Sequence, residues 1–114
     1  MSIILGLALS LAGAAPAPIR APCSLDITFS SYGAGIDAIT LRKTEQLLKR
    51  DRGVATFSRR NWGREGEANL CVYVKKPNDT RRVFDRVRSL LPRKPRGPIT
   101  VTAAGGLQAR APAR

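Results

Sequence analysis

The chain has 114 residues, and its 20 Lys and Arg against 8 Asp and Glu give a formal net charge of +12 at pH 7. This length suffices for one domain. The charge favours anionic partners such as envelope polymers, acidic lipid headgroups or nucleic acid. The sequence contains no histidine, which excludes Ser–His and Cys–His nucleophile pairs and most zinc sites.

An apolar run near the beginning, from Ile3 to Leu11, is followed by small residues. The run is too short for a membrane-spanning helix, which needs about 20 apolar residues. Ala12 and Ala14 form an A-x-A motif, so the sequence predicts a secretory signal peptide over residues 1–14, cleaved after Ala14. The mature protein would then be periplasmic or secreted, without a transmembrane helix. Because no Lys or Arg precedes the run, a retained anchor stays open as an alternative.

The rest of the chain divides into three predicted parts. A linker rich in Pro and Ala covers residues 15–22, a folded domain covers 23–103, and a disordered tail covers 104–114. Asp37 has the position and chemistry of a helix N-cap. Within the domain, alternating apolar and polar residues predict four strands, and helical periodicity predicts two helices. The strands are expected over 23–30, 54–62, 67–76 and 98–103, and the helices over 38–50 and 79–91.

The predicted order, β-α-β-β-α-β, favours an α+β fold of the ferredoxin-like plait type. In that plait a four-stranded antiparallel sheet has the strand order 4-1-3-2, and both helices cover one face. No helix covers the other face of the sheet, which we call the open face. It is either in contact with solvent or covered by a partner or a second copy.

Two cysteines, Cys23 and Cys71, lie 48 residues apart. An even pair in a small exported domain predicts a disulfide. The spacing fits neither a C-x-x-C redox motif nor a metal site. Strand parity places Cys71 on the open face and Cys23 on the covered face. Either Cys23 precedes the regular pairing or a β-bulge intervenes.

Parity also defines the surfaces available to partners. The open face is expected to be a polar floor that includes Asp26 and Asn69, with aromatic and cationic side chains such as Arg60 towards the predicted hairpin. Arg and Trp are favourable contact residues for an anionic or protein partner. The candidate binding patch is Arg60, Trp62, Arg64, Tyr73 and Lys75, and a second basic surface on the outward helix faces comprises Lys43, Arg50, Arg81, Arg82, Arg86 and Arg88.

Three parts of the sequence resemble motifs of known chemistry. The stretch "GAGIDA" matches the G-x-G-x-x-G/A phosphate fingerprint, but a single short crossover and Asp37 at the helix start favour a plain turn. Glu65 and Glu67 near a hairpin tip favour cross-strand salt bridges over an acid–base pair. The first loop has no Arg to accompany Asn69, as acylphosphatases of this fold require.

Nucleic acid is a disfavoured partner, because the basic-Gly-aromatic signature of RNA-recognition modules is missing from "GEANLCVYV". The sequence predicts no cofactor and no metal site.

The run "GID…DRGV…WGREGE…LCV…LLP…PRGP", over roughly residues 23 to 100, resembles a group of short, uncharacterised, exported bacterial proteins. The resemblance implies a single ferredoxin-like domain behind a signal peptide and transfers no activity.

The sequence favours a non-enzymatic binding module that contacts an anionic envelope polymer or a protein partner, with a homodimer through the open face as one possible arrangement. The alternative is a small hydrolase or transferase that uses Arg to hold an anionic substrate.

Overall fold

The computed structural model describes residues 22–113, so the predicted signal peptide, and the predicted linker up to residue 21, lie outside the described residues. The described chain forms five strands and two helices. In chain order they are β1 (Leu25–Phe29), α1 (Ala38–Arg50), β2 (Val54–Asn61), β3 (Ala68–Val74), α2 (Asp79–Ser89), β4 (Ile99–Ala103) and β5 (Leu107–Ala111).

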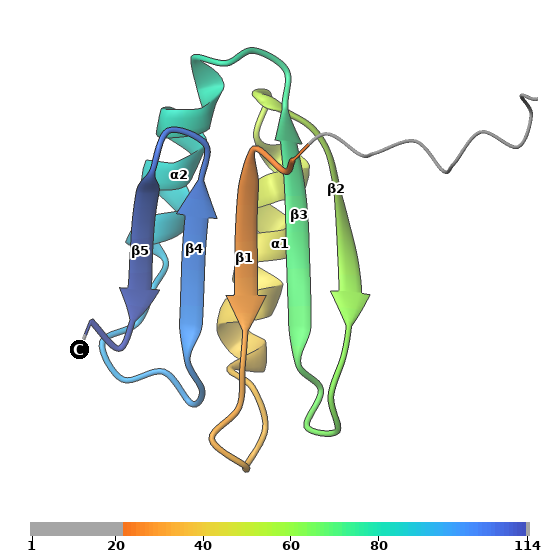
Figure 1. Cartoon of the computed structure of the whole chain (residues 1–114), viewed down its shortest axis with the longest axis vertical. Helices are drawn as coiled ribbons and strands as arrows, with labels where there is room; N and C mark the ends of the chain where they lie inside the picture. The colour runs from red at the N-terminus through yellow and green to blue at the C-terminus, as the bar shows by residue number, and fades with distance from the viewer. Residues whose placement is uncertain (1–21, 114) are drawn as a thin grey trace, which may run out of the picture.

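The strands form one antiparallel sheet in the order β2-β3-β1-β4-β5. Both helices lie on the same face of this sheet, behind it in Figure 1. The α+β class, the placement of the helices and the relative order of the first four strands agree with the sequence prediction. The sheet has five strands, however, and the prediction of four was wrong.

The additional strand, β5, occupies residues predicted to be a disordered tail. A three-residue loop precedes it, in which Gly105 and Gly106 have φ values of 88° and 82°. Glycine adopts this left-handed region without the steric cost of a Cβ, which allows the chain to reverse. Leu107 and Ala109 then pack against the core, and Ala111 is 3% exposed. Because two of these inward side chains are alanines, the apolar and polar positions of the segment differ little in hydrophobicity, and the sequence did not predict the strand.

Alternation along the two central strands builds the core. Leu25, Ile27 and Phe29 of β1 are fully buried, as are Leu70 and Val72 opposite them on β3. Each such side chain contributes about 1.5–3 kcal/mol to folding relative to exposure. The helices close this layer with Leu41, Leu48, Val83, Phe84 and Val87.

Asp37 caps the first turn of α1, as predicted, and also holds a distant loop. Its Oδ1 accepts a hydrogen bond from the backbone N–H of Thr40 at 3.0 Å. Its Oδ2 accepts one from the N–H of Arg96 at 3.3 Å. The carboxylate therefore ties the start of α1 to the loop that leads into β4.

That loop packs closely against the end of β1, and this contact leads to a first prediction. A Cβ on the buried Gly97 would lie 2.1 Å from the carbonyl oxygen of Ser30. Gly97→Ala is expected to lower the free energy of unfolding by about 2 kcal/mol, because backbone must move to admit the methyl group. Urea unfolding measures the loss. Lys94→Ala, at an exposed site in the same loop, should stay within about 0.5 kcal/mol; equal effects would contradict this account.

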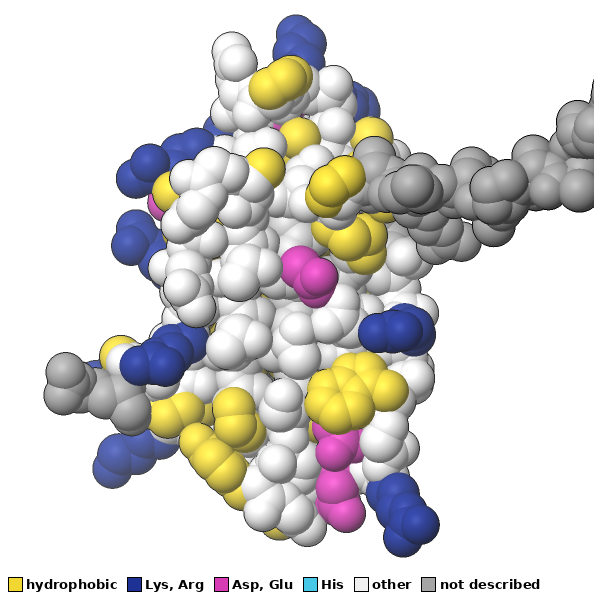
Figure 2. Space-filling view, viewed as in Figure 1, with side chains coloured by type: hydrophobic (Ala, Val, Ile, Leu, Met, Phe, Trp, Pro, Cys, Tyr) yellow, Lys and Arg dark blue, Asp and Glu magenta, His cyan; other side chains and the backbone are white. Residues whose placement is uncertain are grey.

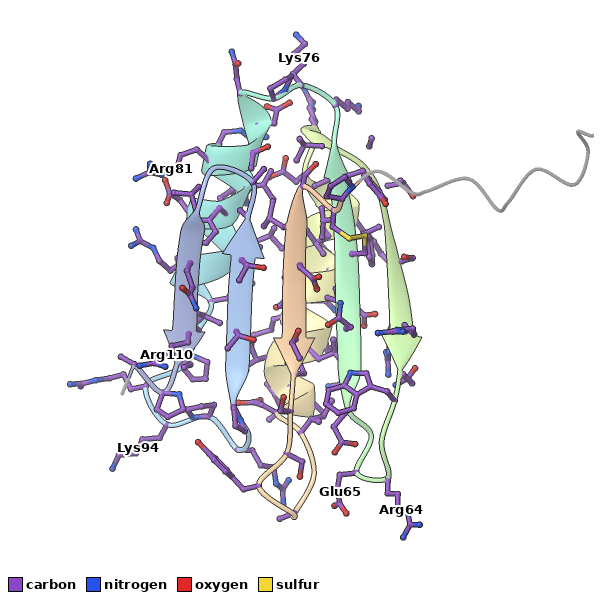
Figure 3. The ribbon with its side chains drawn as sticks, viewed as in Figure 1. Arg64, Glu65, Lys76, Arg81, Lys94 and Arg110 are labelled. Carbon is purple, nitrogen blue, oxygen red and sulfur yellow. A yellow bond between two sulfur atoms is a disulfide. The ribbon has the colours of Figure 1, made fainter. Side chains whose placement is uncertain are left out.

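Cys23 and Cys71 form a disulfide, as predicted, with their Cα atoms 5.4 Å apart (Figure 3). Cys23 lies two residues before β1 begins, outside the regular pairing. This position resolves the parity conflict without a bulge in β1. Just beyond it, the Oγ of Ser24 accepts a hydrogen bond from the N–H of Val74 at 3.1 Å, which fixes the segment beside β3. Within the described part of the chain, neither helix has the length and apolar character needed to cross a membrane.

Candidate functional site

The open face of the sheet carries a depression of about 670 Å³ over β1, β2, β3 and β4. Figure 2 shows this face: uncharged polar groups predominate at its centre, and most Lys and Arg side chains lie along its margins. The depression is lined by Pro22, Cys23, Asp26, Ser58, Arg60, Asn69, Cys71, Tyr73, Thr102, Ala103 and Ala104.

A hydrogen-bonded triad lies on this face, and two of its members, Asp26 and Asn69, line the depression. The β1–β3 register places Thr28 directly opposite Asn69, with Asp26 two residues away on the same face of β1. The hydroxyl of Thr28 donates to Oδ1 of Asn69 at 2.7 Å, and Nδ2 of Asn69 donates to Oδ1 of Asp26. All three side chains are partly buried, so these bonds hold the amide and the carboxylate in fixed orientations.

The neighbouring strand adds a cation beside this triad. Arg60 of β2 lies opposite Asn69, and Ser58 lies opposite Cys71. No ion pair joins Arg60 to Asp26, or to any other acid among residues 22–113. The depression therefore presents a guanidinium, a carboxylate and an oriented amide to the same volume.

The structure brings together some of the predicted patch and separates the rest. Arg60 and Tyr73 both line the depression. Trp62 directly follows β2 and is 42% exposed, and its backbone N–H donates to the carbonyl oxygen of Glu67 across the hairpin at 2.9 Å. Arg64 lies at the tip of that hairpin (Figure 3). Lys75 lies at the opposite end of β3, so the five residues do not form one compact site.

The predicted basic helix faces are partly neutralised on α2. Arg81 and Arg88 both approach Asp85, at 3.5 and 3.6 Å, and these exposed pairs contribute little stability. Arg82 and Arg86 reach a carboxylate at the end of α1 instead. On α1, Lys43 and Arg50 are exposed and make no ion pair within the described residues.

That carboxylate belongs to Asp51, whose side chain is 0% exposed. Arg82 donates to both of its oxygens, at 2.7 and 2.9 Å, and Arg86 donates to Oδ2 at 3.0 Å. The N–H of Gly53 donates to Oδ1 at 2.7 Å. The hydrogen bond from Arg82, opposed by desolvation and reinforced by Gly53, lowers the pKa of Asp51 to about 2. Asp51 thus joins the end of α1 to α2, and sequence reasoning missed it.

The remaining sequence motifs have structural roles. The carboxylate of Glu67 accepts a hydrogen bond from the N–H of Glu65 at 2.8 Å and so shapes the hairpin turn. In "GAGIDA", the N–H groups of Gly33 and Gly35 donate to the hydroxyl of Ser31. Asp37 occupies the helix start where a phosphate would bind. Over residues 22–113, no group of three His, Cys, Asp or Glu side chains is placed to hold a metal ion.

The open-face depression is therefore the strongest candidate site: two of its polar side chains, Asp26 and Asn69, are hydrogen-bonded to each other, and it carries both charges. No protein-family model, curated protein or solved structure matches the chain, and its function is inferred from the geometry of this site.

Proposed function

We propose that the protein is a non-enzymatic binding module that acts in the periplasm or outside the cell and holds an anionic envelope polymer, or the acidic surface of a partner protein. The scaffold would be a ferredoxin-like plait to which β5 is added. The observation that carries this proposal is the open-face depression, where Arg60 makes no ion pair with any residue of 22–113 and stands beside the oriented Asp26–Asn69 pair.

The chemistry of the depression suits a polymer that carries both acidic and hydroxyl groups. Arg60 binds a carboxylate or phosphate through parallel hydrogen bonds. Asp26 and Asn69 supply an acceptor and a donor that hydroxyl groups satisfy. Tyr73 at the depression and Trp62 beyond it offer flat side chains that bury area at low entropic cost.

The charge outside the depression supports the same class of partner. The net charge of +12 accelerates encounter with polyanions. It does so without selecting among them, because exposed charges are screened beyond about 8 Å at physiological salt. Selectivity must therefore come from the depression. The Cys23–Cys71 disulfide forms part of its wall, and such bonds persist in oxidising compartments outside the cytoplasm.

Binding to three polymers tests the proposal. Polygalacturonate carries carboxylates and hydroxyls, polyglutamate carries carboxylates alone, and dextran carries hydroxyls alone. At a salt concentration of about 0.15 M, the protein is expected to bind polygalacturonate most tightly and dextran least. Arg60→Ala should weaken polygalacturonate binding about tenfold, the loss of one charge-assisted contact worth about 1.4 kcal/mol. Isothermal titration calorimetry gives the affinities.

Lys43→Ala removes the same charge from the covered side and is the matched control. It should leave the affinity for polygalacturonate within about twofold at this salt. An equal loss in both variants, or equal affinity for polygalacturonate and polyglutamate, would show non-specific attraction and remove the depression as the site.

A further inference from the structure

The two outer edges of the sheet differ in how they are protected. A register shift between Val54 and Thr56 interrupts the pairing of edge strand β2. Arg59 and Arg60 follow on the same strand, and Arg59 reaches Glu45 of α1 at 3.4 Å. A bulge and charged side chains of this kind discourage another strand from pairing with an edge.

The β5 edge has no such interruption. Its pairing with β4 is regular from Leu107 to Ala111. Because β5 has one neighbour, half of its backbone N–H and C=O groups point away from the sheet. A hollow of about 370 Å³ is lined by the consecutive residues Gln108, Ala109 and Arg110. Consecutive strand residues point to opposite faces, so a hollow that touches all three runs along the edge itself.

A second hollow adjoins this edge on the helix side. It has a volume of about 580 Å³ and lies between β5, the last turn of α2 and the residues after it. Leu91, Pro92 and Ala109 supply apolar surface, and three arginines from three different segments surround them: Arg88, Arg93 and Arg110.

These arginines leave positive charge for a partner. Arg93 and Arg110 make no ion pair within the described residues, and Arg88 has only an exposed contact of 3.6 Å with Asp85. Figure 3 shows Lys94 at the same end of the molecule as Arg110. Among residues 22–113, no acidic side chain lines either hollow.

We propose that the β5 edge is a docking site for an extended, acidic peptide segment of another protein, which adds to the sheet as a sixth strand. Its backbone would pair with the outward groups of β5, and its acidic side chains would contact Arg88, Arg93 and Arg110. A second copy of this chain fits poorly, because pairing β5 with β5 would bring two sets of arginines together without an acid between them. This site is separate from the open-face depression, so either proposal can fail while the other stands.

A short peptide of alternating Glu and Val is the probe, and nitrogen-15 NMR of the full chain reports the site. Addition of the peptide is expected to shift the backbone amide signals of residues 107–111 and of the α2 end near 88–93. The double variant Arg93→Ala/Arg110→Ala should bind the peptide at least about tenfold more weakly. The charge-matched double variant Arg64→Ala/Lys76→Ala, altered at sites away from β5, should bind within about twofold.

Backbone pairing is tested separately from charge. A version of the peptide with N-methyl groups on alternate amides keeps every carboxylate but lacks half of the donors, and it should lose binding. Equal binding by the methylated peptide would overturn strand addition. A response of residues 107–111 to phosphatidylglycerol vesicles but not to the peptide would overturn the proposal in favour of a lipid surface. Dimerisation of the protein alone through the same residues would overturn it in favour of a second copy.

Discussion

The double variant Cys23→Ala/Cys71→Ala is expected to lose about 4 kcal/mol of unfolding free energy relative to the wild type. The disulfide closes a loop with a sequence separation of 48. In the chain-entropy model, closing a loop of this length lowers the conformational entropy of the unfolded chain, and the folded state is stabilised by about that free energy. Urea unfolding under oxidising conditions measures the difference. The midpoint urea concentration of the variant should be lower, and the dependence of the unfolding free energy on urea reports any change in the unfolded state.

Reduction provides the control for this prediction. A reducing agent should lower the stability of the wild type to that of the double variant and leave the double variant itself unchanged. If reduction has no effect on the wild type, the bond does not contribute to stability as described.

The second large effect concerns Asp51. Asp51→Asn is expected to lower the free energy of unfolding by about 2 kcal/mol, because the buried site loses the charged acceptor of the hydrogen bonds from Arg82 and Arg86. Urea unfolding at neutral pH measures the loss. Asp85→Asn is the matched control: Asp85 also contacts two arginines, but its side chain is 44% exposed, and its loss should cost less than about 0.5 kcal/mol.

The same residue predicts a pH dependence of stability. The pKa of Asp51 is about 2 in the folded protein, against 3.8 for an ordinary aspartate side chain. A carboxyl group with a lowered pKa stabilises the fold fully above pH 3.8, and the contribution disappears as the pH falls towards 2. Its size is about 2 kcal/mol. The difference in free energy of unfolding between wild type and Asp51→Asn should therefore decrease as the pH falls from about 4 to about 2. A gap that stays constant over this range would contradict the assignment.

Most of the fold could be predicted because its elements are patterned locally. Leu25, Ile27 and Phe29 alternate with polar residues, and Asp37 marks the start of α1. β5 was missed because alanine contributes two of its three inward positions, Ala109 and Ala111, and alanine gives little contrast with polar neighbours. The useful signal was the pair Gly105–Gly106 between two alternating segments, which is typical of a tight hairpin.

The candidate site could be predicted only in part. Strand parity correctly placed Asp26, Arg60 and Asn69 on one face, because parity follows from local alternation. The Asp51 cluster depends instead on a contact between residues 31 positions apart in sequence. A helix-ending Asp gives no local indication that it will be buried. Arg82 and Arg86 have the spacing of an ordinary solvated face, and their role depends on the fold bringing the end of α1 close to α2.

The position of the disulfide also determines how the domain would respond to mechanical load. Cys23 is bonded across to β3, directly ahead of the point where β1 enters the sheet. Tension transmitted through the residues before Pro22 would therefore enter β1 and β3 together, both of them interior strands. Peeling β1 away from β3 from this end would first require a covalent bond to break, so the disulfide protects this central strand pair when the domain is pulled from that side.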